Sequence, residues 1–152
     1  MYHRFNENKY PSTNIQMDIF LKHIQLIKNL NYDFIHPKKF QKNFSVPKNK
    51  KKILLTIDDA FKSFYDVAWP YLKKNKIPFI LFVSTEPIGN NGYMTWDQIK
   101  ELNKENFVEI GNHSHSHEYL VDESYEVIKD DIEKSILIFK NELGTNSKFF
   151  SY

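Results

Sequence analysis

Short apolar runs and longer segments with helical spacing alternate along the chain. Three apolar runs are nearly continuous, as in strands that are buried on both faces of a parallel sheet. They lie at 52–57, 77–83 and 107–110. Each is followed by a segment with apolar residues three and four positions apart, as in helices with one buried face. These segments lie at 63–75, 95–104 and 124–143. This order predicts an α/β fold whose parallel strands are joined by right-handed helical crossovers.

Two segments are expected to form amphipathic helices that bury one apolar stripe each. The first helix spans 15–32, and its stripe consists of Met17, Phe20, Leu21, Ile24, Ile27 and Leu30. The second spans 124–143, and its stripe consists of Tyr125, Ile128, Ile132, Ile136, Phe139 and Leu143.

Local signals mark the ends of several elements. Pro70 inside the helical pattern predicts that this helix starts late or kinks there. Pro78 suits only the beginning of the strand at 77–83. Thr95 and Gln98 form a capping-box signature at a helix start. The segment 148–152 is expected to begin another strand.

The composition fits one globular domain and argues against several other classes of protein. The chain has 152 residues, 41% of them hydrophobic, and a net charge of +2, so neither disorder nor a nucleic-acid partner is indicated. The basic run 48–52 is predicted to be a solvated linker. No cysteine is present, which excludes disulfides and thiolate metal sites. No apolar run reaches the length of a membrane span, and the first residues lack the apolar core of a signal peptide.

The first candidate cluster lies where the strand at 52–57 ends. Asp58 and Asp59 follow this strand directly. A pair of aspartates at such a place can also be a helix cap or a solvated turn. Because neighbouring side chains at a strand end point in different directions, one carboxylate can face a metal while the other faces an attacking water.

The second candidate cluster consists of His113, His115 and His117. In a turn, His113 and His117 share a face and His115 points away, which gives a two-histidine site. In an extended strand all three share a face and give a three-histidine site. Gly111 and Asn112 indicate that the strand has already ended, which favours the two-histidine pair and leaves His115 as a loop residue. An exposed polar turn is the remaining alternative.

One carboxylate and two imidazoles together form a ligand set for a divalent metal. Three protein ligands leave coordination positions open for water and substrate, as in catalytic rather than structural sites. The second carboxylate is then left over as the base that takes a proton from water. Both clusters lie at the carboxyl ends of predicted parallel strands, where sites form in folds of this kind.

These two motifs, in this order and separation, resemble those of polysaccharide deacetylases with a NodB homology domain (carbohydrate esterase family 4). The segment 55–60, Leu-Thr-Ile-Asp-Asp-Ala, resembles the first family motif, Thr-Phe-Asp-Asp-Gly. The segment 113–117, His-Ser-His-Ser-His, resembles the second, His-Ser/Thr-x-x-His. Met1-Tyr2-His3 and Met94-Thr95-Trp96 also fit the family, so the resemblance covers essentially the whole chain.

The resemblance implies a role for each candidate residue. Asp58 would be the general base, whereas Asp59, His113 and His117 would hold the metal, which is usually Zn²⁺ in this family. The implied reaction is hydrolysis of the acetamide of N-acetylated sugars in a polysaccharide, so the implied partner is a carbohydrate and not a nucleic acid. The implied fold is the family's distorted (β/α) barrel, of which 1–152 is expected to be a single, incomplete domain.

The chain also departs from the family pattern. Ala60 stands where the family usually has glycine, and Ile57 where it has phenylalanine. The segment 149–152 resembles the start of the third motif, with Ser151 where many members have an arginine. The alternative function is therefore that of an inactive truncated remnant which binds metal or carbohydrate. Exposed sheet edges would favour self-association or a complementing segment. The resemblance implies that the full-length form lies in the cell envelope or outside the cell.

Overall fold

A three-stranded parallel sheet forms the centre of the computed structural model, which describes residues 1–40 and 51–152. Its strands are β5 (Leu55–Ile57), β6 (Phe79–Val83) and β7 (Val108–Asn112), in this spatial order. Parallel bridges extend the sheet at both edges, from Tyr2 to Ile57 and from Asn112 to Phe150. The predicted α/β fold with parallel strands is therefore confirmed, and the described strands form open sheets.

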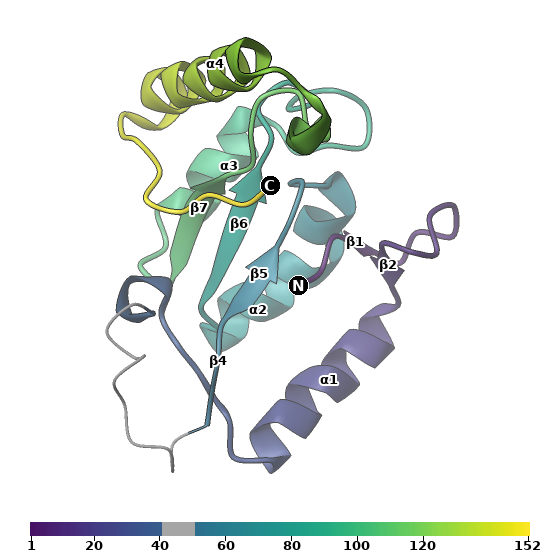
Figure 1. Cartoon of the computed structure of the whole chain (residues 1–152). Coiled ribbons are helices and arrows are strands. Elements are labelled where there is room, and N and C mark those ends of the chain that lie inside the picture. Colours follow the sequence, from purple (N-terminus) through teal and green to yellow (C-terminus); the bar gives the residue numbers. More distant parts are fainter. Residues whose placement is uncertain (41–50) are drawn as a thin grey trace.

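Helices connect the strands of the sheet. A π-helical turn, η3 (Phe64–Ala68), leads into α2 (Trp69–Asn75) between β5 and β6, and α3 (Trp96–Asn103) lies between β6 and β7. The short 3-10 helix η4 (Leu120–Asp122) and the long helix α4 (Tyr125–Leu143) follow β7. In Figure 1, α2 and α3 lie behind the sheet, whereas α4 lies at its upper end.

The N-terminal part adds two small parallel pairs and one helix. Strands β1 (Arg4–Phe5) and β2 (Asn14–Ile15) pair with each other, and α1 (Met17–Asn29) follows them. Strand β3 (Asp33–Phe34) pairs with β4 (Lys52–Ile53), and the 3-10 helix η1 (Pro37–Lys39) follows β3. The phenol oxygen of Tyr2 lies 2.8 Å from Nδ1 of His23, which joins α1 to the start of the chain.

The hydrophobic core joins the sheet to these helices. Aromatic rings meet edge to face within it, with centroids 5.2 Å apart for Phe5 and Phe20 and 5.6 Å apart for Phe64 and Phe79. The largest fully buried side chains are Phe5, Phe20, Phe64, Phe79, Phe139, Ile24, Ile57, Leu72, Ile80, Leu81, Met94 and Ile99.

The local signals of the sequence are borne out. The α-helix α2 begins only at Trp69, directly after the π-helical turn, and Pro70, which has no backbone N–H to donate, lies at this change of helix type. Pro78 precedes β6 and does not interrupt it. The capping box of α3 is formed: the backbone N–H of Gln98 donates to Oγ1 of Thr95, and the backbone N–H of Thr95 donates to Oε1 of Gln98.

Two strand predictions are wrong in their bounds. The run 52–57 is not one strand, because Leu54 separates β4 from β5 and each part pairs with a different neighbour. Strand β7 continues through Gly111 to Asn112, because β6 supplies a partner for each residue up to that point. The segment 148–152 forms one bridge, at Phe150.

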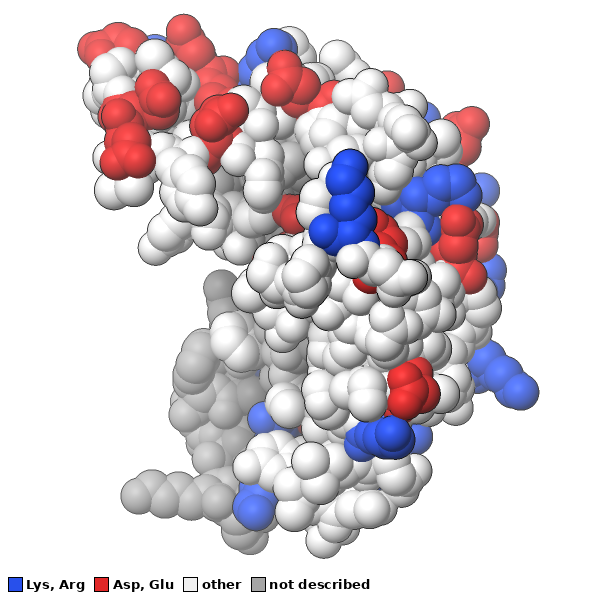
Figure 2. All heavy atoms as spheres, turned by 90° about the vertical axis from the view of Figure 1, so that its right-hand side faces the viewer, with Lys and Arg blue, Asp and Glu red and all other residues white. Residues whose placement is uncertain are grey.

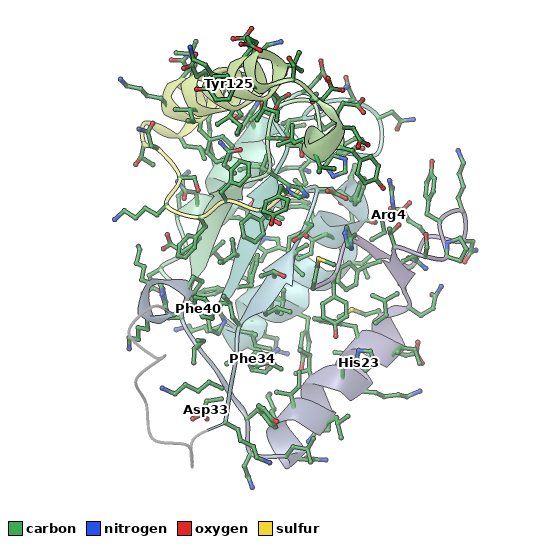
Figure 3. The ribbon with its side chains drawn as sticks, viewed as in Figure 1. Arg4, His23, Asp33, Phe34, Phe40 and Tyr125 are labelled. Atoms are coloured by element: carbon green, nitrogen blue, oxygen red, sulfur yellow. The ribbon has the colours of Figure 1, made fainter. Side chains whose placement is uncertain are left out.

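The two predicted helical stripes are only partly buried. Phe20 and Ile24 are buried in α1, and Phe139 is buried in α4. Four other members of the stripes are exposed, because only part of each helix packs against the core. They are Leu21, Leu30, Tyr125 and Ile136, and Figure 3 shows Tyr125 on α4, at the upper end of the molecule.

Two predictions concern parts of the chain outside this core. A linker is predicted at 48–52. Residues 48–50 of this segment lie outside the described residues. Within 1–40 and 51–152, no helix is both long and apolar enough to span a membrane.

Candidate metal centre

The two predicted clusters meet at the carboxyl ends of the sheet strands. Asp58 and Asp59 follow β5, His113 follows β7, and β6 lies between these two strands. The backbone turns sharply at both places, with left-handed φ angles of 70° at Asp59 and 65° at His117. Parallel strands that end at one edge, each followed by a tight turn, therefore bring residues more than fifty positions apart into one site.

Three side chains converge around one carboxylate oxygen. Oδ1 of Asp59 lies 2.9 Å from Nε2 of His117 and 3.3 Å from Nε2 of His113. The ligand atoms of the three residues all lie within 4.8 Å of one another. Asp59 and His113 are buried, whereas His117 is exposed at the surface. Within the described residues, this is the one group of acidic and histidine side chains with a spacing that suits a metal ion.

The unsatisfied atoms of the site fit a bound cation. Oδ1 of Asp59 and Oδ1 of Asp58 are buried and have no well-directed hydrogen-bond partner among the described residues. Buried carboxylate oxygens are costly when unpaired, and a divalent ion would satisfy the oxygen of Asp59. Burial raises the pKa of Asp59, but the nearby imidazoles of His113 and His117 outweigh burial and hold this pKa well below its usual range. Asp59 is thus ionised and suited to a cation.

Asp58 differs from its neighbour in its electrostatic environment. Burial raises the pKa of Asp58 above that of an ordinary carboxyl group, although His113 and His3 oppose this shift. Its backbone N–H donates to the carbonyl of Tyr2 over 2.8 Å, which fixes the main chain at this point. A carboxylate with a raised pKa accepts a proton more readily, as a general base requires.

His113 is held in an orientation that leaves one ring nitrogen free. Its Nδ1 lies 2.9 Å from the backbone carbonyl of Ser151. A carbonyl oxygen only accepts, so Nδ1 donates to it, and Nε2 is the ring nitrogen that faces Asp59. This contact is the arrangement by which proteins orient metal-binding histidines. The carbonyl of His113 in turn accepts a hydrogen bond from the hydroxyl of Ser84 over 2.7 Å.

His115 points away from the other two histidines, as the turn interpretation predicts. It lies in the loop after β7, as predicted, but its side chain is buried and its Nδ1 lies 2.7 Å from Oγ1 of Thr85. The spacing of the three histidines thus separates His115 from the other two, but it does not reveal the buried contact with Thr85.

Several supporting residues have no signal in the sequence. The carboxylate of Asp131 in α4 accepts hydrogen bonds from the backbone N–H groups of His115 and Ser116. Burial raises the pKa of Asp131, but the hydrogen bonds from Ser116 and His115 lower it overall. The side chain of Asn112 donates to the buried hydroxyl of Ser135, also in α4. These hydrogen bonds join residues fifteen or more positions apart, so no local pattern in the sequence predicts them.

The surface beside His117 is strongly acidic. The segment 118–133 contains seven Asp and Glu residues and a single lysine. Figure 2 shows acidic side chains gathered at the upper end of the molecule, which carries α4. The local field therefore favours cations near this end, although the net charge of the chain is +2.

Replacing Ala60 with glycine is expected to leave stability almost unchanged. Ala60 has a φ of 53°, so glycine would remove a left-handed strain of about 1–2 kcal/mol. Glycine would also lose a buried methyl worth about 0.8 kcal/mol and would gain entropy in the unfolded chain. The matched control is Ala68→Gly, equally buried but helical, which should cost about 1.5 kcal/mol. Urea unfolding would measure both, and equal losses would contradict the strain at position 60.

Comparisons with known proteins agree with the fold and the two motifs. A sequence model of the family described as "Polysaccharide deacetylase" matches residues 45–152. YxkH of Bacillus subtilis (strain 168), which is named for polysaccharide deacetylase activity, is 24% identical over all of this chain and 54% of its own length. The poly-beta-1,6-N-acetyl-D-glucosamine N-deacetylase of Staphylococcus aureus (strain N315) is 26% identical over 76% of this chain and 42% of its own length. The chain thus spans about half the length of these curated relatives.

Solved structures of other proteins share the fold of this chain. The deacetylase PplD of Streptococcus pyogenes, in complex with acetate, has a TM-score of 0.85 at 26% identity, over 100% of this chain and 71% of its own. IcaB from Ammonifex degensii has a TM-score of 0.84 at 24% identity, over 99% of this chain and 71% of its own, which shows a shared fold.

Proposed function

The chain belongs to the polysaccharide deacetylase family, and we propose that it carries the metal site and the base of an enzyme that removes acetyl groups from N-acetylated sugars. In this proposal, residues 1–152 form a single domain of that family. The observation that carries the proposal is the convergence of Asp59, His113 and His117 on one point, with the buried carboxylate of Asp58 beside them.

The chain supplies two separate kinds of group to this reaction. Asp59, His113 and His117 would hold a divalent ion, which we propose to be Zn²⁺ because one carboxylate and two imidazoles suit it. When bound, the ion would supply Lewis-acid activation of water and of the amide carbonyl. Asp58 would accept the proton of the attacking water, since it is adjacent to the ligands without being one of them.

The proposed products are acetate and a free amine on the sugar. Two comparisons support this choice of substrate. The relative from Staphylococcus aureus is named for poly-beta-1,6-N-acetyl-D-glucosamine, and the structurally similar deacetylase from Streptococcus pyogenes was solved with acetate. A polymer of N-acetylglucosamine is therefore the first substrate to test.

The test combines metal binding with acetate release. The metal-free chain would be titrated with Zn²⁺ in the presence of a competing chelator, and acetate release would then be measured on β-1,6-linked and β-1,4-linked N-acetylglucosamine oligomers. One ion per chain together with acetate release, lost after chelation and restored by Zn²⁺, is the expected result. Metal binding without acetate release from any oligomer would favour the alternative, a metal- or carbohydrate-binding module without turnover. A folded chain that takes up no metal would overturn the proposal.

A further inference from the structure

The loop that carries the two histidine ligands is held in a conformation that its sequence does not favour. Ser114 and His117 both have left-handed φ angles, 68° and 65°, which cost energy for residues with a side chain. Such a conformation persists only where surrounding contacts impose it. The contacts that impose it therefore decide where the two imidazoles point.

One side of the loop is held through its carbonyl groups. The backbone N–H of Thr85 donates to the carbonyl of Ser114 over 3.2 Å, and that of Glu86 donates to the carbonyl of His115 over 3.0 Å. Both donors belong to the chain that leaves β6, so this side is tied to the sheet.

The other side is held through its N–H groups by a single carboxylate. Oδ2 of Asp131 accepts from the N–H of His115 over 2.7 Å, and Oδ1 accepts from the N–H of Ser116 over 2.8 Å. These are charge-assisted hydrogen bonds, the stronger kind, and both oxygens of one side chain are used. The two residues that Asp131 binds lie between His113 and His117 in the sequence.

A second contact from α4 lies one turn further along the helix. The side chain of Asn112 donates to the buried hydroxyl of Ser135 over 2.8 Å, and its Oδ1 accepts from the N–H of Ser114 over 2.8 Å. Asp131 and Ser135 lie four residues apart on one face of α4. Helix α4 therefore makes hydrogen bonds to Asn112, where the loop begins, and to the backbone in the middle of the loop.

We propose that Asp131 is a positioning residue of the metal centre: its carboxylate binds the two N–H groups between the histidine ligands and so sets the separation of the two imidazoles. This inference rests on the metal site of the proposed function. Residues that orient metal ligands without touching the metal typically change metal affinity by about 10- to 100-fold when they are removed. Asp131 is not one of the proposed ligands, so its positioning effect would be transmitted through the backbone of His115 and Ser116, and the control for its charge is the adjacent Asp130.

The test compares three variants with the parent chain. Asp131→Ala removes both acceptors. Asp131→Asn keeps one acceptor oxygen in nearly the same volume, but its NH₂ group cannot accept from the second N–H. Asp130→Ala is the matched control, since it removes the same charge from the adjacent, exposed position of α4. Zn²⁺ affinity would be measured by chelator competition, ligand geometry by the visible spectrum of the Co²⁺ form, and folding by circular dichroism.

We expect Asp130→Ala to bind Zn²⁺ within about twofold of the parent chain and Asp131→Ala to bind about 10-fold or more weakly, with Asp131→Asn between them. The Co²⁺ spectrum should change in the Asp131 variants alone, at unchanged helix content. Parental affinity and spectrum in a folded Asp131→Ala or Asp131→Asn would overturn this inference and leave the proposed function standing. Absence of metal binding by the parent chain would instead overturn the proposed function, and this inference with it.

Discussion

Asp58→Asn is expected to lower the rate of acetate release by at least about 100-fold, the usual contribution of a general base, while the divalent ion stays bound. Asparagine has nearly the shape of aspartate, so the buried position remains filled, but its amide does not accept a proton from water. In Asp59→Asn, by contrast, loss of the ion is expected to be the primary effect. This substitution would remove the negative charge of the proposed ligand that converges with His113 and His117, so the ion should be lost first and the rate should fall as a consequence.

Acetate release and metal content, measured on the same samples, separate the two aspartates. Asp66→Asn serves as the control, because its carboxylate lies on an exposed helical turn and pairs with Lys62 there. Exposed ion pairs of this kind contribute little, so this variant should match the parent chain in both measurements. Full turnover by Asp58→Asn would show that another group takes the proton. Loss of the ion from Asp58→Asn would mean that Asp58 is itself a ligand.

The meeting of the two aspartates and the two histidines could be predicted from the sequence because it follows from topology. Apolar runs of strand length that alternate with helical segments allow few arrangements other than parallel strands with helical crossovers. The carboxyl ends of such strands share one edge, so Asp59 and His113 had to approach each other. The turn at 113–117 followed from Gly111 and Asn112, although the strand extends through both of them.

The supporting contacts could not be predicted, because they depend on backbone groups and on distant packing. His113 is oriented by the backbone carbonyl of Ser151. Every residue type has such a carbonyl, so the sequence does not reveal which one makes this contact. Asp131 is one of several acidic residues on α4, and only its position opposite the loop distinguishes it. Burial of a helical stripe likewise depends on what lies against it, which is why Tyr125 is exposed although the periodicity predicted it to be buried.

Gly111→Ala is expected to destabilise the fold by about 3 kcal/mol, near the upper end of the usual cost of overpacking. A Cβ at this position would overlap Cδ1 of the Phe82 ring and would lie 2.5 Å from its Cε1 and 3.0 Å from Cγ2 of Ile80. Phe82 and Ile80 are both buried in β6, so the ring has little room to move. Urea unfolding would measure the loss.

Two further variants separate this clash from the general cost of replacing a glycine. Gly144→Ala meets no atom within 4 Å but has a φ of 71°, so it should cost about 1 kcal/mol through backbone strain alone. Phe82→Val removes both clashing ring atoms, so adding Gly111→Ala to this variant should cost much less than in the parent chain. Additive effects of the two substitutions would contradict the clash.

The same substitution should affect the proposed metal centre, because the ring of Phe82 lies near both Gly111 and the proposed ligand His113. The centroids of the Phe82 and His113 rings lie 6.2 Å apart, and His113 lies two residues after Gly111 in the sequence. A ring pushed away from position 111 would therefore press on the imidazole that Ser151 and Asp59 hold in place. We expect Gly111→Ala to weaken Zn²⁺ binding under conditions where it is still folded, and Gly144→Ala, which is remote from the site, to leave binding unchanged. Parental Zn²⁺ affinity in folded Gly111→Ala would show that the strain is relieved within β6 and β7 before it reaches His113.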